Sequence, residues 1–229
     1  MEGEGEDDEI VCLDGSFFID DNYQLTTFTF GSHVLELYCL QSASTDFDLT
    51  GQLVWPGAVL LNDYLSKNAE TLQGRSVIEL GSGVGITGML CSRFCREVVL
   101  TDHNEEVLKI LKKNIELQES SQNSLCCAEL KFEKLEWGNS DQLNSILQGQ
   151  PREFDLSSVP LLFDTVEKLL SVGNENKCKF ILAYVSRTKV MDTLVISEAI
   201  RHGLQINEVT GTRAVVRNLE GVIFEITLG

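Results

Sequence analysis

The chain has 229 residues, of which 43% are hydrophobic and 23% charged, and its formal net charge at pH 7 is −17. This length and composition allow one globular domain with a full core, while the negative charge disfavours nucleic-acid partners and attracts basic proteins. No stretch has the ~18 uninterrupted apolar residues of a membrane span, and the acidic first residues are unlike the positive start of a signal peptide. We therefore expect a monomeric cytoplasmic protein, also able to enter the nucleus, that binds neither nucleic acid nor membrane.

The first third of the chain predicts an acidic tail, a hairpin and a helix. Residues 1–9 are rich in glycine and acidic residues and are expected to be disordered, with one domain over residues 10–229. The two runs 24–30 and 33–39 alternate apolar and polar residues around Gly31-Ser32, which is typical of a hairpin with a two-residue turn. Residues 58–65 have the pattern of an amphipathic helix.

From residue 76 onward, the predicted strands and helices alternate, as in an α/β fold with a mainly parallel sheet. Strands are expected at 76–80, 97–102, 129–137, 152–156, 180–185, 205–209 and 222–228, with helices around Met89, Leu90 and Phe94 and over 105–116, 161–170 and 191–202.

A glycine-spaced turn follows the first of these strands. The run from Val77 to Gly88 ends an apolar strand, places glycines at Gly81, Gly83 and Gly85, and continues as a helix. Glycine permits positive φ and close approach of the backbone to a ligand, and the start of a helix directs unpaired N–H groups to the same place. The sequence therefore predicts a nucleotide-sized pocket here.

The carboxylate of Glu79, two positions before Gly81, selects among nucleotides. The spacing Gly83-x-Gly85-x-x-Gly88 also fits a dinucleotide-binding turn, but a carboxylate repels a pyrophosphate and attracts a cationic amino group. S-adenosylmethionine carries an amino group and a sulfonium and has no phosphate. The alternative is that Glu79 only caps the following helix.

Asp102 ends the second predicted strand and should lie beside the glycine turn at the carboxyl edge of the sheet. A carboxylate in that position can accept hydrogen bonds from both ribose hydroxyls. The alternative is that Asp102 caps the helix over residues 105–116, a role for which Asn104 competes. His103 directly follows Asp102, and we assign it no catalytic role.

The only two tryptophans, Trp55 and Trp137, each stand next to a proline or a glycine at an element boundary. A flat indole there can stack on an adenine, a contact of the order of 1–3 kcal/mol by analogy with base stacking. The alternative is that both tryptophans are core anchors.

These residues, together with the runs 50–58 and 135–138, resemble the seven-β-strand protein methyltransferases of family 16, most of which methylate lysine. The likeness covers about Phe47 to Gly229. It implies a Rossmann-like seven-stranded sheet, closed by an antiparallel pair of the last two predicted strands and here with an amino-terminal β-hairpin extension, and S-adenosylmethionine as cofactor. By this resemblance Trp55 lines the cofactor pocket, Gly81, Ser82 and Gly83 hold the methionine moiety, Asp102 the ribose, and Trp137 the adenine.

The chain departs from the family pattern after residues 152–156, the expected fourth core strand. The sequence passes directly to Ser157, Ser158 and Pro160, without the family's acidic or small polar residue and nearby aromatic. We interpret this as an internal deletion of about ten residues, given usual strand and loop lengths. The alternative is a strand shifted across Pro160, which proline disfavours. No catalytic residue can be named.

Seven irregularly spaced cysteines are typical of reduced thiols. Cys91 and Cys95 lie one helical turn apart, but no histidine has a matching ligand spacing, so we expect no metal. Two functions are therefore weighed: a protein methyltransferase acting on a lysine-bearing protein, and an impaired variant that binds cofactor or protein only. A nicotinamide oxidoreductase is a third, more distant alternative.

Overall fold

The structure is a computed structural model that describes residues 22–42, 49–120, 128–148, 158–172 and 178–229. The acidic run 1–9 and the expected strand 152–156 lie outside these ranges. None of the helices within the described ranges is long and apolar enough to cross a membrane.

The amino-terminal hairpin forms as its alternating pattern predicts. Strands β1 (Gln24–Phe30) and β2 (His33–Cys39) pair antiparallel along their whole length, and Gly31 in the turn has a φ of +58°. Every second residue of β2 is buried, namely Leu35, Leu37 and Cys39. The hairpin therefore lays one apolar face on the domain and leaves the other in solvent.

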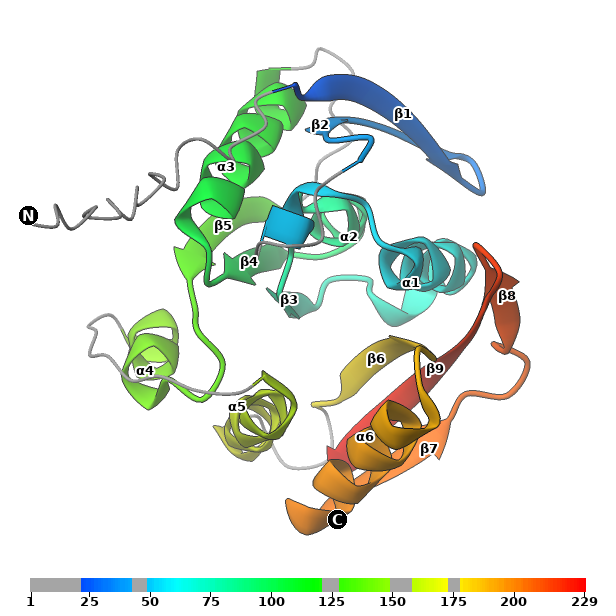
Figure 1. The fold of residues 1–229 in the computed structure, drawn as a ribbon. Coiled ribbons are helices and arrows are strands. Elements are labelled where there is room, and N and C mark those ends of the chain that lie inside the picture. The colour runs from blue at the N-terminus through cyan, green and yellow to red at the C-terminus, as the bar shows by residue number, and fades with distance from the viewer. Residues whose placement is uncertain (1–21, 43–48, 121–127, 149–157, 173–177) are drawn as a thin grey trace, which may run out of the picture.

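Three parallel strands form the first core sheet, in the order β3-β4-β5 (Figure 1). Val98 and Leu100 of the central strand β4 are completely buried. Crossover helices join the strands, as parallel pairing requires. The bounds are β3 (Ser76–Leu80), α2 (Ile86–Cys91), β4 (Glu97–Asp102), α3 (Glu105–Ser120) and β5 (Glu129–Lys134).

The second sheet has the order β6-β9-β7, with the short strand β8 also paired to β9. Strand β9 runs antiparallel to its three neighbours, which confirms the expected antiparallel closing pair. The bounds are β6 (Phe180–Val185), β7 (Leu204–Glu208), β8 (Ala214–Val216) and β9 (Leu219–Leu228).

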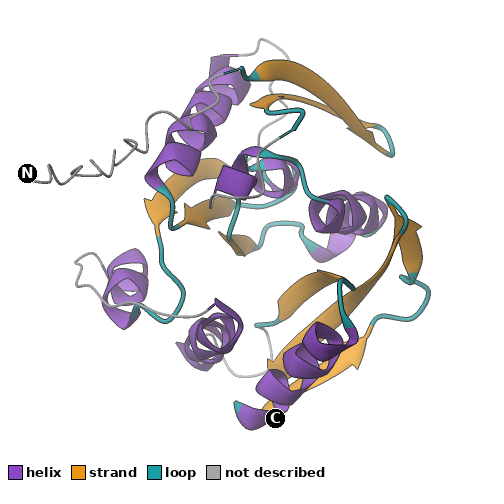
Figure 2. Cartoon of the chain, in the orientation of Figure 1, coloured by secondary structure: helices purple, strands orange, loops and turns teal. Residues whose placement is uncertain are grey.

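Helices lie on both sides of the strands, and this arrangement is a Rossmann-like α/β fold (Figures 1 and 2). One side carries α1 (Pro56–Lys67), α2 and α3, and the other carries α4 (Ser140–Gln148), α5 (Ser158–Val172) and α6 (Lys189–Arg201). Two short 3-10 turns, η2 (Leu49–Gln52) and η3 (Ala69–Thr71), flank α1.

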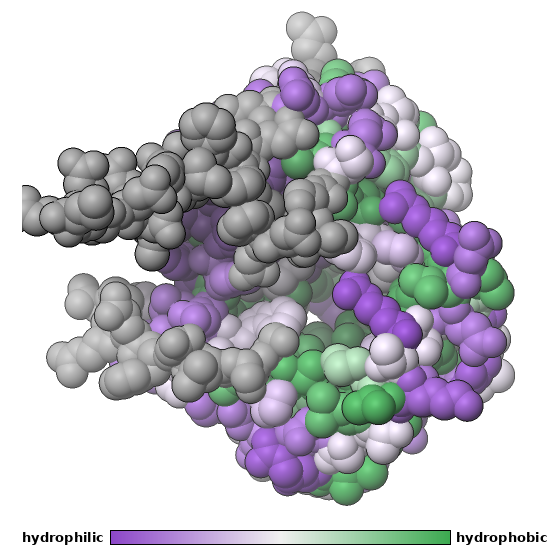
Figure 3. Space-filling view, viewed as in Figure 1, coloured by the Kyte–Doolittle hydropathy of each residue, from purple (hydrophilic) through white to green (hydrophobic). Residues whose placement is uncertain are grey.

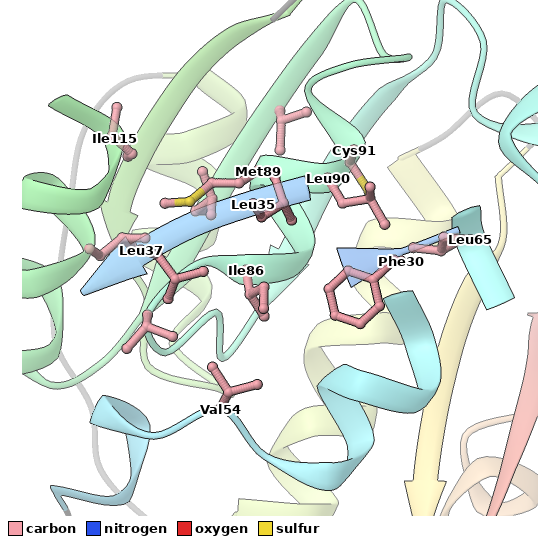
Figure 4. Close-up of a cluster of buried hydrophobic side chains, with 14 of the residues drawn as sticks. Phe30, Leu35, Leu37, Val54, Leu65, Ile86, Met89, Leu90, Cys91 and Ile115 are labelled. Carbon is pink, nitrogen blue, oxygen red and sulfur yellow. The ribbon is translucent and has the colours of Figure 1, made fainter. Parts of the chain in front are cut away.

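The buried side chains form two separate clusters. The larger one joins β2, α1, α2, β4 and α3, and includes Leu37, Ile86 and Met89 (Figure 4). The smaller one joins α5, α6 and the second sheet around Phe163, Val195 and Ile226. The division falls close to the gap between β3 and β6, where Leu80 of β3 packs against the smaller cluster.

Two predicted elements are longer than those observed. Helix α2 ends at Cys91, so Phe94 lies beyond it, in a turn where its ring meets His33 edge-on at 5.1 Å. Strand β5 ends at Lys134 rather than at Trp137, because residues 137 and 138 form a turn in which Gly138 has a φ of +84°.

Candidate functional site

The glycine turn connects β3 to α2 in the predicted conformation. Gly81, Gly83 and Gly85 have φ values of +68°, +53° and +86°. Ser82 fixes the turn to β4, since its N–H donates to the Thr101 carbonyl at 2.8 Å and its hydroxyl accepts from the Thr101 N–H at 2.9 Å. The turn is therefore held at the carboxyl edge of the sheet by the backbone and the side chain of Ser82.

The closest neighbours of these glycines belong to the chain itself. A Cβ on Gly83 would lie 2.6 Å from the Gly51 carbonyl oxygen, and one on Gly85 would lie 2.4 Å from Leu111 Cδ1. A Cβ on Gly81 would lie 3.1 Å from the Trp137 ring. Positive φ and tight packing both require glycine here, before any ligand is considered.

Glu79 lies beneath the turn and caps α2. Its Oε2 accepts from the Gly88 N–H at 2.8 Å, so the helix-capping alternative is observed. Burial raises the pKa of Glu79 from 4.5 to about 7, against the opposing effect of its hydrogen bonds to Gly88, Thr87 and Ser82. Glu79 therefore combines a structural role with a carboxylate whose ionisation a nearby cation would favour.

Asp102 is buried at the end of β4, with an exposed fraction of 6%. Its two oxygens accept from the Gly83 N–H at 3.0 Å and from the Asn104 N–H at 3.1 Å. The cap of α3 is Asn104, whose Oδ1 accepts from the N–H groups of Glu106 and Val107 at 2.9 and 3.3 Å. The capping alternative thus applies to Asn104, and Asp102 is directed toward the glycine turn.

The two tryptophans approach the turn from either side. Trp55 occupies the N-cap position of α1, half-buried, with the Arg187 guanidinium 4.6 Å from its ring centroid. Trp137, also half-buried, follows β5 and lies against Gly81. Neither tryptophan belongs to the two buried clusters, a result that weakens the core-anchor alternative.

A single cavity of about 930 Å³ joins these residues. Of the eight predicted cofactor residues, Trp55, Glu79, Gly81, Ser82, Gly83, Asp102 and Trp137 line it, whereas Gly85 does not. Gly85 instead packs on Leu111, so its place in the predicted set has a packing explanation. Around the turn, the acidic groups that line the cavity are Glu79 and Asp102, beside the exposed His103.

Sequence reasoning did not identify several residues that shape the site. The Gly51 carbonyl oxygen packs against Gly83 of the turn. The Thr101 hydroxyl donates a hydrogen bond to the Glu79 carbonyl at 2.7 Å. Asn114 of α3, completely buried, donates to the carbonyls of Val84 and Tyr38 at 3.0 and 2.9 Å. A buried asparagine on an apolar helix face was the available signal for Asn114.

Metal-ligating side chains do not gather anywhere in the part of the chain that is described. Cys91 and Cys95 are free, buried thiols, and so is Cys39, while Cys178 is free and exposed. Buried thiols of this kind commonly act as small apolar residues.

Comparisons with known proteins identify the family of the chain. A sequence model described as lysine methyltransferase matches residues 38–197. Protein-lysine N-methyltransferase EFM3 of Chaetomium thermophilum is 30% identical over 61% of this chain and 43% of its own length. Protein N-lysine methyltransferase METTL21A of Mus musculus is 33% identical over 64% of this chain and 62% of its own length.

A solved TehB-like methyltransferase from Corynebacterium glutamicum aligns with 78% of this chain and 90% of its own, at 15% identity and a TM-score of 0.49. The chain covers less than two thirds of the length of EFM3 and METTL21A. The family match, in contrast, begins at the end of β2 and extends over the glycine turn, Asp102 and Trp137. The chain belongs to the lysine methyltransferase family.

Proposed function

We propose that this chain binds S-adenosylmethionine and transfers its methyl group to a lysine side chain of a protein substrate. The observation that carries this proposal is the family match over residues 38–197, which contains the whole carboxylate-and-glycine site. The names of EFM3 and METTL21A, both protein-lysine methyltransferases, support the same acceptor.

The site fits this cofactor by its donor chemistry. The two carboxylates near the turn, Glu79 and Asp102, suit a ligand with a cationic amino group and two ribose hydroxyls. A phosphate-bearing ligand would face the same carboxylates and be repelled. Trp137 presents its indole beside Gly81, where an adenine could stack, and Trp55 closes the opposite side.

When bound, S-adenosylmethionine supplies an activated methyl group on a positively charged sulfur. The chain's own residues align the reactants and exclude water. The carboxylates of Glu79 and Asp102 stabilise the positive charge of the ligand. A lysine amine with an ordinary pKa near ~10.4 must lose its proton before it can attack. No residue for that deprotonation is assigned: the acceptor-side motif expected from the family resemblance is missing from the sequence after residue 156, and residues 149–157 lie outside the described ranges.

The proposal is tested by cofactor binding followed by methyl transfer. We expect S-adenosylmethionine to raise the melting temperature of the chain, and Asp102→Asn to remove that rise. Asparagine keeps an acceptor oxygen for the Gly83 N–H but offers none to the Asn104 N–H, so the melting temperature of the variant without cofactor is measured first, and only the further rise with cofactor is compared. The matched control is Asp63→Ala on the exposed side of α1, which should leave the rise unchanged.

Radiolabelled methyl transfer to the proteins of a cell lysate then separates the two functions. Label on protein lysine supports the proposal. Binding without label supports the impaired cofactor-binding variant, and the absence of any response to S-adenosylmethionine overturns the assignment of the pocket.

A further inference from the structure

A buried amide, that of Asn62 in α1, is connected to the cavity through one hydroxyl. The molecule is hollowed between the part that carries β3 and the part that carries β6 (Figure 3). Glu79 and Thr87 line the cavity, whereas Asn62 is completely buried behind its lining. Asn62 Nδ2 lies 3.1 Å from the hydroxyl oxygen of Thr87, the second residue of α2. A polar residue on the packed face of α1 thus reaches the cavity by way of Thr87.

The direction of the hydrogen bond between Asn62 and Thr87 is fixed by a third group. Asn62 Nδ2 also lies 2.8 Å from the Ala58 carbonyl oxygen, one turn earlier on α1. A carbonyl oxygen can only accept, and the reversed amide would bring two oxygens together, so the amide nitrogen must face Ala58. The two N–H groups of Asn62 then donate to Ala58 and to Thr87. Thr87 is therefore the acceptor of the pair.

The Thr87 hydroxyl is in turn directed at Glu79. A hydroxyl has one proton to donate, and the oxygen of this one already accepts from Asn62. The proton is thus free for the carboxylate of Glu79, with which Thr87 forms a side-chain hydrogen bond. The amide donates to the hydroxyl and the hydroxyl donates to the carboxylate. Hydrogen bonds arranged in such a series strengthen one another in a buried environment.

These donors act on the charge of Glu79. The Gly88 N–H donates to Glu79 Oε2 at 2.8 Å, and the Thr87 hydroxyl adds a donor from a side chain. Hydrogen bonds to a carboxylate favour its charged form, whereas burial favours the neutral form. Without the Thr87 hydroxyl, Glu79 would stay neutral over a wider range of pH. A neutral carboxyl attracts a cationic amino group much less than a carboxylate does.

Three other ionisable groups lie near Glu79 in the cavity. The negative charge of Asp102, at the end of β4, raises the pKa of Glu79, and the charge of Glu79 raises the pKa of the Cys91 thiol at the end of α2. The exposed His103 lies beside Asp102. All three groups are retained when only Thr87 or Asn62 is changed, so a comparison at one pH isolates the hydroxyl.

We propose that Thr87, oriented by Asn62, is a positioning residue that holds the Glu79 carboxylate in the charged form that attracts the cationic cofactor. This inference rests on the proposed binding of S-adenosylmethionine. It adds two residues to those identified above, one in the lining of the cavity and one behind it.

Replacement of the Thr87 hydroxyl by a methyl group tests the step from Thr87 to Glu79 without any cofactor. Thr87→Val keeps the branched shape and removes the donor, whereas Thr87→Ser keeps the donor. In the original chain, the stability contributed by neutral Glu79 is lost as the pH rises to about 7, the pKa of Glu79 in the folded chain. Thr87→Val should extend that loss by about one pH unit. Thr87→Ser should leave its upper limit unchanged, and urea unfolding from pH 5 to 9 measures both.

Two controls separate this effect from a loss of packing. Thr165 of α5 is similarly buried, but its hydroxyl accepts from the Gly138 N–H at 2.8 Å and donates to the Leu161 carbonyl at 2.9 Å. Thr165→Val should therefore lower stability by the same amount at every pH. In a chain that carries Glu79→Gln, Thr87→Val should likewise have an effect that does not change with pH.

Cofactor affinity gives the second measurement. One pH unit in the pKa of Glu79 lowers its ionised fraction at pH 7 from about a half to about a tenth. Thr87→Val should therefore bind S-adenosylmethionine about fivefold more weakly at pH 7, and the difference should shrink as the pH rises. Asn62→Ala should act in the same direction with a smaller effect, and Thr87→Ser should bind like the original chain. Isothermal calorimetry measures these affinities, and the amino group of the ligand titrates equally in every comparison.

The proposal is overturned if Thr87→Val leaves the upper pH limit of the stability loss unchanged, or if Thr87→Ser moves it as far. It is also overturned if Thr87→Val binds S-adenosylmethionine at pH 7 as tightly as the original chain. An original chain that binds no S-adenosylmethionine at any pH overturns the proposed function instead. In that case the unfolding experiments still decide whether Thr87 acts on Glu79.

Discussion

Glu79 couples the stability of the chain to pH. Its pKa is about 7 in the folded chain and near 4.5 in an unfolded one, so the folded state holds more protons between these values. Stability contributed by the neutral carboxyl is therefore complete below about pH 4.5 and is lost as the pH rises to about 7. At 1.4 kcal/mol per pKa unit the whole effect is about 3 kcal/mol.

We predict that Glu79→Gln removes this pH dependence. Glutamine keeps an acceptor for the Gly88 N–H but cannot ionise. At pH 8 the variant should be more stable than the original chain by up to about 3 kcal/mol, and at pH 5 much less so. Urea unfolding at the two pH values measures this, and parallel stability curves for the two proteins would contradict it.

At the glycines, the structure gives a different physical reason from the one the sequence suggested. The glycine pattern predicted positive φ correctly. It also led us to expect that a ligand is the group that closely approaches the glycine backbone. At Gly83 and Gly85 the close approach is to Gly51 and Leu111, residues far apart in the sequence. Local spacing cannot show which distant segment will pack against a turn.

Gly85→Ala should therefore destabilise the fold through packing. Gly85 and Gly74 both have positive φ, but only Gly85 has neighbours within 4 Å of the added Cβ. The strained φ should cost each alanine variant about 1–2 kcal/mol, and overpacking should add about 1–3 kcal/mol at Gly85. Urea unfolding of Gly85→Ala and Gly74→Ala measures the difference, and equal losses would contradict the packing role.

At the scale of elements, patterns that depend on nearby residues were reliable. The hairpin, β4 and β6 have the predicted bounds, because alternation and continuous apolar runs are local properties. Helix α2 was predicted too long, since Phe94 continues the apolar pattern but leaves the helix to meet His33 of the hairpin. The sequence could not predict that β3 and β6 belong to two separate sheets, because strand pairing depends on segments far apart in the chain.

Asn114 links three elements and should be needed for their arrangement. Its side chain accepts from the Tyr38 N–H at 2.7 Å and donates to Tyr38 and Val84, which joins β2, α3 and the glycine turn. Asn114→Ala would leave these buried groups without their partner, at a cost of about 1–3 kcal/mol for each unsatisfied group.

The matched control for Asn114→Ala is Gln118→Ala, one turn later on α3. Gln118 donates an exposed hydrogen bond to the Glu36 carbonyl at 2.8 Å, and the loss of an exposed side chain should cost about 0.5 kcal/mol or less. Denaturant unfolding compares the two variants. Similar small losses in both would show that Asn114 does not hold the hairpin against the turn.

At the scale of the whole molecule, the net charge of −17 favours a basic protein as the methyl acceptor. A lysine-rich partner is attracted over distances comparable with the Debye length, about 10 Å at 0.1 M salt. Six of the carboxylates lie in residues 1–9, so a chain without residues 2–9 would have a net charge of −11. Comparing these two chains therefore distinguishes the contribution of residues 2–9 to this attraction from that of the rest of the chain.

We predict that poly-L-lysine binds both the full chain and the chain lacking residues 2–9, and that salt weakens both complexes. The full chain should show the steeper loss of affinity between 50 and 300 mM salt, roughly tenfold or more, because more ion pairs are screened. Isothermal calorimetry at several salt concentrations measures the two slopes. Equal slopes would place the attraction on the body of the domain, and the absence of any salt effect in either chain would contradict electrostatic attraction of a basic acceptor.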